Sequence, residues 1–371
     1  MHHCQTRFSA HALSVAAFFR LLLFFTVCIL VAGEAAAAPS GPPAPATPEN
    51  PLRVALLLEH PGGDNGWNDA LLRGLERARR DLPVRADVLV APPQADAAAL
   101  QGFFQQAATS HDLVLVASDR MHESLRNNAA NFRRTMFGCI DAGIRAPNIM
   151  CITFADEQAA YLAGAAAAML TTQTALPGIN ADRTIGWLSG EDVPAMRSLL
   201  NGFVEGARLV DPEVRVINKI TGSFTDAAAG REAARQLLDQ GADVLVLACG
   251  AGNGPAMDEA AARGAYVVGL DNNQDNRLPG QVLTSIVKKA DTAVYDLVAA
   301  ATSGNFKGKE ILVRDLQNGG VDITDMAPFK AAAGKNVPAG LERRLRELRG
   351  ELMHGGIRLK SLREKTLCDC L

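Results

Sequence analysis

Acidic, amide and aromatic side chains stand at the ends of apolar segments in this sequence. GGDNGWND follows an apolar run that ends at Leu58, and it sets Trp67 and Asn68 among glycines. Asp141 and Asp271 each end another apolar run. An ionised carboxylate accepts hydrogen bonds from hydroxyl or N–H groups, and an amide both donates and accepts. These residue types suit the non-covalent binding of a polar ligand.

Apolar runs alternate with helical patterns from Leu52 onwards. Runs such as LRVALLL and ADVLVLA are typical of parallel strands that helices cover on both faces. Open parallel sheets bind ligands beyond the carboxyl ends of their strands. This rule adds candidates at other strand ends, although ordinary turns use the same residue types: Ser189, Gly190, Gly222, Ser223, Phe224, Gly250, Gly252, Asn253, Gly254, Asn272 and Asn273.

The two series of strands and helices predict an α/β fold with two doubly wound parallel-sheet lobes, a hinge and a cleft between the lobes. We expect the first lobe to span residues 52–154 and about 275–325, because the run QVLTSIV and its helix return to it. The second lobe takes residues 155–274 and a C-terminal helix at about 336–355. Residues 356–371 form a tail.

The composition predicts a large core and excludes some partners. The chain has 371 residues, 48% of them hydrophobic, and a net charge of −3. This charge gives no reason to expect nucleic acid as a partner. Alanine and glycine are abundant, so helices are expected to pack closely. Histidine is sparse, and neither clustered acids nor a Ser–His–Asp arrangement is recognisable, so we expect no metal, no cofactor and no enzyme activity.

The first 38 residues predict an export signal. Arg7 and Arg20 precede the apolar run LLLFFTVCILVAG, and AAAAPS offers small residues for cleavage. The run is too short for a good membrane span. Cys28 suggests a lipoprotein as the alternative, but FTVC lacks the small residues expected before a lipidated cysteine. We therefore expect a free periplasmic protein with a proline-rich linker at residues 39–51.

The cysteines indicate no disulfide framework. Cys139 and Cys151 lie on successive predicted strands, so they either form a bridge or are two buried apolar residues. Cys368 and Cys370 lie at the end of the chain without other ligands nearby. We interpret them as part of a frayed tail rather than as a metal site.

Several segments together resemble the basic membrane protein family of periplasmic substrate-binding proteins, which includes purine-nucleoside receptors of ABC transporters. The resemblance runs from about Val54 to Leu359 and is carried by the order and spacing of segments that are weak alone. It implies a type I periplasmic fold that closes around a ligand and delivers it to a permease. The segments are GGDNGWND, FGCIDAGIRAPNIMCITFADEQAAYLAGAAAAML, IGWLSGEDVPAM, TGSFTDAAAGREAARQLLDQGADVLVLACGAGNGPAMDEAAARGAYVVGLDNNQ and VLTSIVKKADTAVYDLV.

In nucleoside-binding members of that family, the base stacks on aromatic rings while carboxylates, an amide and a lysine hold its edge and the ribose. The resemblance implies that Trp67 is the stacking residue, with the Asn68 amide beside it. It implies that Asp141 accepts from the base edge and that Asp271 accepts from ribose hydroxyls. Lys288 would then donate to a hydroxyl nearby.

Phe224, in GSF, is the candidate for the opposite side of the base, and Gly250 lets the backbone approach the ligand or turn into a helix. The sequence departs from the family at the end of the first strand, where nucleoside binders often have an aspartate. Here LLLEHPGG places Glu59 or His60 at that point, which changes the expected sugar contacts. Tryptophan in place of phenylalanine at position 67 enlarges the platform and adds an indole N–H donor.

Each candidate also has a purely structural interpretation. Trp67 could pack on the edge of its lobe, and Asp141 and Asp271 could cap the helices that follow. Lys288 could be a surface lysine, although the start of a helix is a poor place for a cation. Trp187, inside IGWLSG, is expected in the core. The stretch GAGNG lacks the GK(S/T) ending of a phosphate loop.

We expect a periplasmic receptor that binds a purine nucleoside or related purine and passes it to an ABC permease in the inner membrane, acting as a monomer. Two alternatives stay open at this point. A sensor that reports to a signalling partner would show the same sequence features. An exported nucleoside-processing enzyme could use Asp271 and Lys288 for acid–base work.

Overall fold

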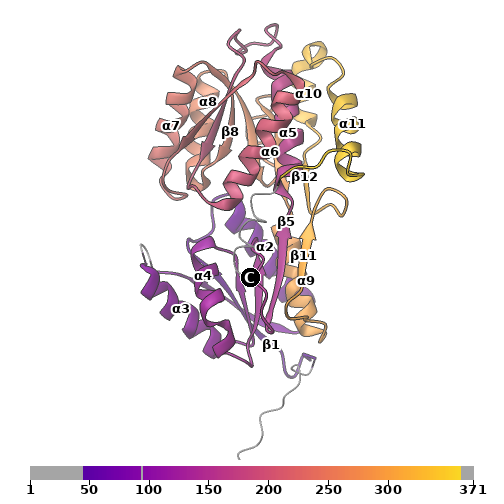
Figure 1. The fold of residues 1–371 in the computed structure, drawn as a ribbon. Helices are drawn as coiled ribbons and strands as arrows, with labels where there is room; N and C mark the ends of the chain where they lie inside the picture. Colours follow the sequence, from indigo (N-terminus) through magenta and orange to yellow (C-terminus); the bar gives the residue numbers. More distant parts are fainter. Residues whose placement is uncertain (1–44, 93–94, 361–371) are drawn as a thin grey trace, which may run out of the picture. The chain divides into compact units, whose positions relative to one another are not determined.

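The computed structural model describes residues 45–92 and 95–360. The expected export signal, the first part of the expected linker, and Cys368 and Cys370 lie outside the described residues. Within the described ranges, no helix is long and apolar enough to cross a membrane. The described chain forms two six-stranded sheets with helices packed against them, which confirms the predicted α/β class (Figure 1).

The first sheet is entirely parallel, and we call it with its helices the first lobe. Side chains alternate between its faces, so Leu56 joins the core under helix α2 (Trp67–Asp81) while Leu57 joins the core under α3 (Ala97–Ser110). Helix α9 (Ala290–Thr302) packs beside α2. The strands in spatial order are β11 (Ile311–Arg314), β5 (Ile149–Phe154), β4 (Met136–Ile140), β3 (Leu113–Val116), β1 (Leu52–Leu58) and β2 (Val84–Val90), and α4 (Asp119–Asn128) lies beside α3.

The second sheet is parallel except for one short edge strand, and we call it with its helices the second lobe. Its strands in spatial order are β12 (Val321–Ile323), β10 (Val282–Lys288), β9 (Tyr266–Asp271), β8 (Ala242–Ala248), β6 (Thr184–Ser189) and β7 (Arg215–Ile220). Its helices divide between two cores. One core contains α5 (Asp156–Thr171), α6 (Pro194–Val210), α10 (Ala327–Ala333) and α11 (Leu341–Met353), and the other contains α7 (Ala227–Asp239) and α8 (Asn253–Ala262).

Glycines let α5 and α6 pack backbone against backbone. A Cβ at Gly164 of α5 would lie 2.0 Å from the carbonyl oxygen of Phe203 in α6. A Cβ at Gly206 of α6 would lie 2.0 Å from the carbonyl oxygen of Tyr161 in α5. No side chain fits at such a distance, so the expectation of close helix packing through small residues is confirmed for this pair.

One lobe boundary predicted from the sequence is wrong. We expected the run at residues 282–288 to return to the first lobe, but β10 pairs with β9 in the second sheet. The loop at residues 272–281 contains no helix, yet it brings the chain back as a parallel neighbour of β9. Ile286 is then buried in the second lobe, and β12 pairs antiparallel beside it. The chain crosses to the first lobe only after Lys288.

The described chain crosses between the lobes at three places that backbone hydrogen bonds hold together. Ala155, before α5, donates its N–H to the carbonyl oxygen of Arg314 at the end of β11, at 2.8 Å. Lys289, between β10 and α9, donates to the carbonyl oxygen of Gly320, before β12, at 2.9 Å. These crossings therefore form one joint next to the carboxyl ends of the strands.

Cys139, Cys151 and Trp187 are buried in the hydrophobic cores. Cys139 and Cys151 face each other in register on β4 and β5, and both thiols are free and buried. Their sulfur atoms contact carbonyl oxygens of the loop between the two strands, with Cys151 Sγ 3.2 Å from Ile144 O. The alternative of two buried apolar cysteines therefore holds rather than a bridge. Trp187 of β6 is fully buried, which confirms its predicted place in the core.

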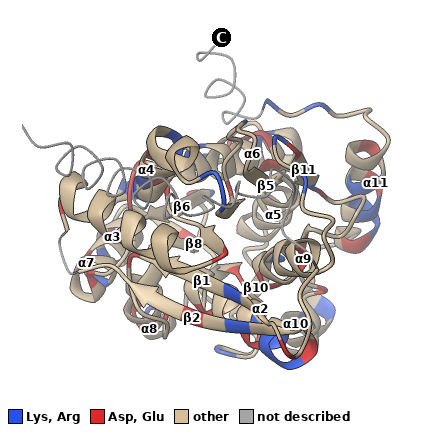
Figure 2. Ribbon diagram, turned by 90° about the horizontal axis from the view of Figure 1, so that it is seen from below, with Lys and Arg blue, Asp and Glu red and all other residues tan. Residues whose placement is uncertain are grey.

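Charged side chains of both signs are interspersed on the surface. In Figure 2, blue and red segments share helix α11, where Arg346 lies 3.8 Å from Glu342 and Arg344 lies 3.6 Å from Glu347. Exposed pairs of this kind contribute little stability, about 0–1 kcal/mol each. The charges of Lys288 and Asp156, in contrast, are buried near the joint between the lobes.

Candidate functional site

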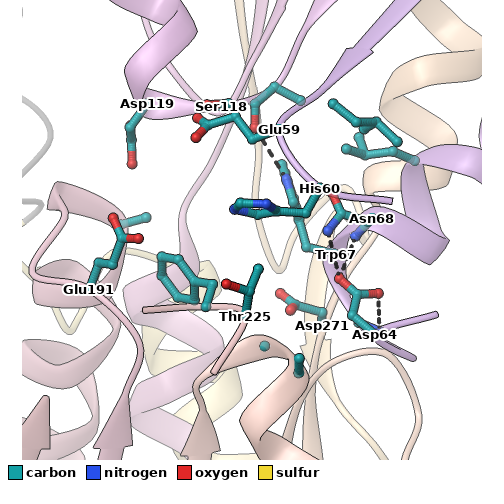
Figure 3. Close-up of a pocket in the computed structure, with 18 of the residues that line it drawn as sticks. Glu59, His60, Asp64, Trp67, Asn68, Ser118, Asp119, Glu191, Thr225 and Asp271 are labelled. Atoms are coloured by element: carbon teal, nitrogen blue, oxygen red, sulfur yellow. Dashed lines mark hydrogen bonds between the residues drawn. The ribbon is translucent and has the colours of Figure 1, made fainter. Parts of the chain in front are cut away.

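A cavity of about 480 Å³ lies at the carboxyl ends of strands from both sheets. It is lined from the first lobe by the segments that follow β1, β3 and β4, and from the second by those that follow β6, β7, β8 and β9 (Figure 3). The structure brings these candidates from the sequence to one lining: Glu59, Trp67, Asn68, Asp141, Phe224, Gly250, Asn253, Asp271 and Lys288. The other candidates at strand ends do not line the cavity: Ser189, Gly190, Gly222, Ser223, Gly252, Gly254, Asn272 and Asn273.

A carboxylate shapes the glycine-rich loop before α2. Asp64 accepts from the backbone N–H groups of Gly66 and Asn68, both at 2.9 Å, and so satisfies donors that have no partner within the helix. The side-chain amide of Asn68 also donates to Asp64, at 3.0 Å. The loop thereby fixes Trp67 in the first turn of α2. The Asn68 amide, expected at a base edge, has an acceptor within the protein for its N–H.

Trp67 is held at three points around its ring. Its indole Nε1 donates to the carbonyl oxygen of Ala117 at 3.2 Å, so the extra donor expected for a ligand is engaged within the first lobe. The ring meets Phe154 edge-on, with centroids 6.4 Å apart. Lys288 Nζ lies 4.8 Å from the indole centroid, a cation–π distance. The indole is thus oriented firmly while it still lines the cavity.

Lys288 is the centre of a buried ion cluster that joins the lobes. Its Nζ lies 3.0 Å from Asp141 Oδ2 and 2.9 Å from Asp156 Oδ2. The side chains of Lys288 and Asp156 are 6% and 1% exposed, so these charges are shielded from water. Lys288 ends β10 rather than starting a helix as expected, and no helix follows Asp141, which adopts a φ of 73°. The structure therefore contradicts a surface position for Lys288 and shows it buried and ion-paired.

Asp271 ends β9 in the left-handed backbone region, with a φ of 68°. Burial raises its pKa to about 7, Lys288 opposes that rise, and the carboxylates of Asp64, Asp156 and Asp141 add to it. An aspartate in this state titrates near neutral pH. A ligand that offers hydroxyl donors would stabilise its ionised form, because hydrogen bonds to a carboxylate favour the charge.

Phe224 and Gly250 are positioned against each other. Gly250 has a φ of 62°, and a Cβ there would lie 2.3 Å from the carbonyl oxygen of Phe224. The backbone N–H of Ala251 donates to the same oxygen at 2.8 Å. Glycine at position 250 is therefore required to hold the Phe224 segment at the cavity. This close approach, rather than a phosphate loop, accounts for the glycine at this position.

Glu59 forms an ion pair with Arg120 on the first-lobe side of the cavity lining. Its carboxylate accepts from Arg120 Nη1 at 3.1 Å. Burial raises the pKa of Glu59, and Arg120 acts against that rise. Glu191, from the second lobe, adds a like charge that raises it further. Figure 3 shows Glu59 and His60 on one side of the cavity and Glu191 on the other.

Several polar residues of the lining were not among the candidates from the sequence: Asp64, Ser118, Asp119, Arg120, His122, Glu191 and Thr225. Most of the missed residues in the first lobe follow β3 and start α4. The rule that sites lie beyond strand ends applies to β3 as well, and DLVLVASDRMH carries that signal. The residues were overlooked because SDRMH reads as an ordinary helix start.

The chemistry of this lining is that of recognition. It offers an indole and a phenyl ring, several carboxylates, one lysine and one arginine, so carboxylates outnumber the Lys and Arg side chains. Among residues 45–92 and 95–360, no three His, Cys, Asp or Glu side chains are grouped so that they could hold a metal ion. A neutral, flat ligand with several hydroxyl or N–H donors fits such a lining.

Comparisons with known proteins agree with a binding role. A family model described as ABC transporter substrate-binding protein PnrA-like matches residues 52–341. The ABC transporter nucleoside-binding protein BmpA of Lactococcus lactis is 30% identical over 293 residues, which are 73% of this chain and 81% of that protein. An uncharacterized lipoprotein of Pyrococcus horikoshii is 29% identical over 305 residues, 76% of this chain and 73% of the relative.

Solved structures share the fold. An ABC transporter solute-binding protein from Aeropyrum pernix K1 superposes with a TM-score of 0.77 and 25% sequence identity, covering 84% of this chain and 94% of its own. The two doubly wound lobes have the type I fold of periplasmic solute-binding proteins, as the resemblance implied. These relatives are substrate-binding proteins rather than enzymes. The chain belongs to the PnrA-like family of ABC transporter substrate-binding proteins.

Proposed function

We propose that this protein binds a purine nucleoside or a related purine in the cavity and delivers it to an ABC importer. The observation that carries the proposal is a single cavity in which an indole ring meets partly buried carboxylates from both lobes: Trp67, Asp141 and Asp271. A base has a flat face for stacking, which contributes about 1–3 kcal/mol. Its ribose offers hydroxyl donors that suit carboxylates.

The roles of the lining residues follow from their chemistry. Trp67 is the proposed platform for one face of the base, and Phe224 is the proposed ring for the other. Asp271 is the proposed acceptor for ribose hydroxyls, since its pKa of about 7 falls when donors surround it. Lys288 and Asp141 lie 3.0 Å apart, so we propose that they contact the ligand as a pair.

The relatives support a place outside the cytoplasmic membrane. The Lactococcus lactis relative is named as an ABC transporter nucleoside-binding protein, which favours both the ligand class and the transporter partner. The Pyrococcus horikoshii relative is named a lipoprotein. That name favours lipid anchoring. From the sequence FTVC we had expected lipid anchoring less than a free periplasmic protein. Cys28 lies outside the described residues, so we propose only that the protein acts at the outer face of the membrane.

A thermal-shift panel tests the proposal. The protein is purified without its first 38 residues, unfolded and refolded to remove bound solute, and heated with purine nucleosides, pyrimidine nucleosides, free bases and sugars. A ligand at 100 times its dissociation constant adds about 2.7 kcal/mol to the unfolding free energy. We expect purine nucleosides to raise the melting temperature most. A rise with sugars alone, or with none of these compounds, would overturn the proposal.

Variants separate the cavity from other binding surfaces. Trp67→Ala and Asp271→Ala are expected to lose most of the nucleoside-induced shift. Asp87→Ala is the matched control, because Asp87 is an exposed residue of β2 outside the cavity lining. Equal shifts in all three variants would place the ligand somewhere other than this cavity.

A further inference from the structure

The loop after β9 in the second lobe contacts the glycine-rich loop that carries Trp67 in the first. The side-chain amide of Asn272 donates to the carbonyl oxygens of Asn65 at 3.0 Å and Gly66 at 2.7 Å. The amide of Gln274 donates to the Asn65 oxygen as well, at 3.0 Å. Neither amide belongs to the described residues that line the cavity. The second lobe therefore holds the loop of the first lobe through residues outside the ligand's reach.

Two arginines fix which end of each amide faces the loop. Arg73 of α2 donates to Asn272 Oδ1. Arg277 Nη1 donates to Gln274 Oε1 at 3.2 Å. An arginine only donates, so each amide oxygen must face its arginine. The NH₂ group of each amide then faces the carbonyl oxygens of the loop, where it is the matching donor.

The loop after β9 is itself tied to its own sheet. Gln274 is buried, and Gly269 of β9 leaves room for it, because a Cβ at Gly269 would lie 2.7 Å from Gln274 Cγ. The backbone N–H of Gln274 donates to Ser285 Oγ of β10 at 2.9 Å. The buried carboxylate of Asp275 accepts from Ser285 Oγ at 2.7 Å and from Thr324 Oγ1 at 2.9 Å. A loop fixed in this way can position its neighbour rather than follow it.

The contact lies between two of the proposed ligand contacts, which come from different lobes. Trp67 directly follows Gly66, and Asp271 directly precedes Asn272. A Cβ at Gly66 would lie 3.2 Å from Asp271 Oδ2 and 3.7 Å from Asp64 Cγ, so the glycine lets the carboxylate approach the loop. Figure 3 shows Asp271 beside Asp64 of this loop. The amide contacts therefore set the spacing between the indole and the Asp271 carboxylate.

We infer that Asn272 and Gln274 are positioning residues that hold the Trp67 loop against Asp271 and so set ligand affinity without contacting the ligand. The apparent affinity of a site scales with the fraction of molecules that hold the binding-competent arrangement, and these hydrogen bonds raise that fraction. Asn272, a candidate ligand contact from its place at a strand end, acts on the loop instead. The inference rests on the proposed function for nucleoside affinity, whereas the position of the indole can be measured without a ligand.

Fluorescence of the ligand-free protein gives the first readout. Trp187→Phe leaves Trp67 as the only tryptophan, so emission in this background reports on the loop. Asn272→Leu and Gln274→Met remove the amide donors with little change in volume. We expect acrylamide quenching of Trp67 to rise by about twofold in the double variant, because the loop loses the contacts that keep it closed.

Calorimetric titration of inosine into the refolded proteins gives the second readout. We expect Asn272→Leu and Gln274→Met each to weaken inosine binding by about fivefold, the effect of losing one hydrogen bond. Asn273→Ala is the matched control, because Asn273 is an exposed residue of the same loop whose side chain accepts from the Asp275 N–H at 2.9 Å, within the second lobe. It should leave both quenching and affinity unchanged.

Unchanged quenching in the double variant, or equal effects in Asn273→Ala, would overturn the inference and leave the proposed function standing. A lower melting temperature with unchanged inosine affinity would also overturn it, because the amides would then be purely structural. Asn272 is only half-buried, so Asn272→Leu tests the inference even where a Gln274 variant fails to fold. If the unaltered protein binds no nucleoside, the proposed function fails, and the quenching of Trp67 still decides whether the amides position the loop.

Discussion

Lys288 Nζ lies 3.0 Å from Asp141 Oδ2, and this contact joins the last residue of a strand in the second lobe to the loop after a strand in the first. Asp156, at the start of α5, lies 2.9 Å from the same ammonium. All three residues are close to places where the chain crosses between lobes or leaves a strand end. A buried cluster at the joint therefore couples the arrangement of the lobes to the floor of the cavity.

Removing the cation at this joint should destabilise the fold. Lys288→Met takes the ammonium away from two carboxylates of low exposure, and breaking a buried ion pair in this way costs about 3–5 kcal/mol. Urea unfolding at pH 7 measures the loss. Lys289→Met is the matched control, because Lys289 is exposed, and it should change the unfolding free energy by less than about 0.5 kcal/mol. Similar losses in both variants would contradict the role of the cluster.

Two tryptophans allow the platform to be tested by fluorescence. Trp67 lines the cavity, whereas Trp187 is fully buried in the second lobe. Ligand binding should change the emission of Trp67 alone. We expect the change to persist in Trp187→Phe and to disappear in Trp67→Phe. Trp67→Ala should also weaken nucleoside binding by about 1–3 kcal/mol. A signal that survives Trp67→Phe would remove the indole from the binding site.

Nucleoside affinity should rise with pH through neutrality. Asp271 has a pKa of about 7, so it is mostly protonated at pH 6 and mostly ionised at pH 8. Only the ionised form accepts from two ribose hydroxyls without giving up a proton. The dissociation constant should therefore fall by roughly tenfold from pH 6 to pH 8. Asp271→Asn should bind weakly and with a flat pH profile, and an unchanged slope in that variant would assign the dependence to another group.

The stability of the ligand-free protein should change with pH in the opposite sense. The folded state holds the Asp271 proton more tightly than the unfolded chain, because the pKa is raised from 3.8 to about 7. Between pH 4 and about 7 the unfolded chain ionises this group while the folded state keeps it protonated, so the unfolding free energy falls as pH rises across that range. Relative to Asp271→Asn, the ligand-free protein should lose stability across that range. A difference between the two proteins that does not vary with pH would argue against the raised pKa.

Glycine at position 250 should be irreplaceable for two reasons. Its φ of 62° disfavours any side chain, and a Cβ would lie 2.3 Å from Phe224 O. Gly222→Ala is the matched control, because Gly222 has a φ of 83° but nothing within 4 Å of the added Cβ. Gly222→Ala should cost about 1–2 kcal/mol from backbone strain alone. Gly250→Ala should cost more in thermal unfolding and should also weaken nucleoside binding, and equal losses would mean that the contact with Phe224 is unimportant.

The sequence predicted the fold class and part of the cavity lining because strands and strand ends follow from local patterns. Strands such as β1 and β8 are continuous apolar runs, and Asp141 and Asp271 directly follow or end strands, where parallel sheets place their sites. The apolar run of β10 does not reveal which sheet it joins, because either core would bury it. That is why its lobe was predicted wrongly.

Partners far apart in the sequence could not be predicted in the same way. The Trp67 N–H donates to Ala117, and the Lys288 ammonium lies beside Asp156, and neither contact leaves a mark in the local pattern. Ser118 and His122 are recognised as lining residues only once the fold shows which strand ends meet at the cavity. The place of the start of α4 in the cavity lining is therefore a property of the three-dimensional structure.

The most direct test of the central claim is a calorimetric titration of inosine or guanosine into the refolded protein and into a Trp67→Ala/Asp271→Ala double variant. The account predicts one site per chain in the unaltered protein. It also predicts a loss of affinity of at least about a hundredfold in the double variant, which corresponds to about 2.7 kcal/mol. The absence of heat with either nucleoside, or equal affinity in the double variant, would contradict a purine nucleoside site in this cavity.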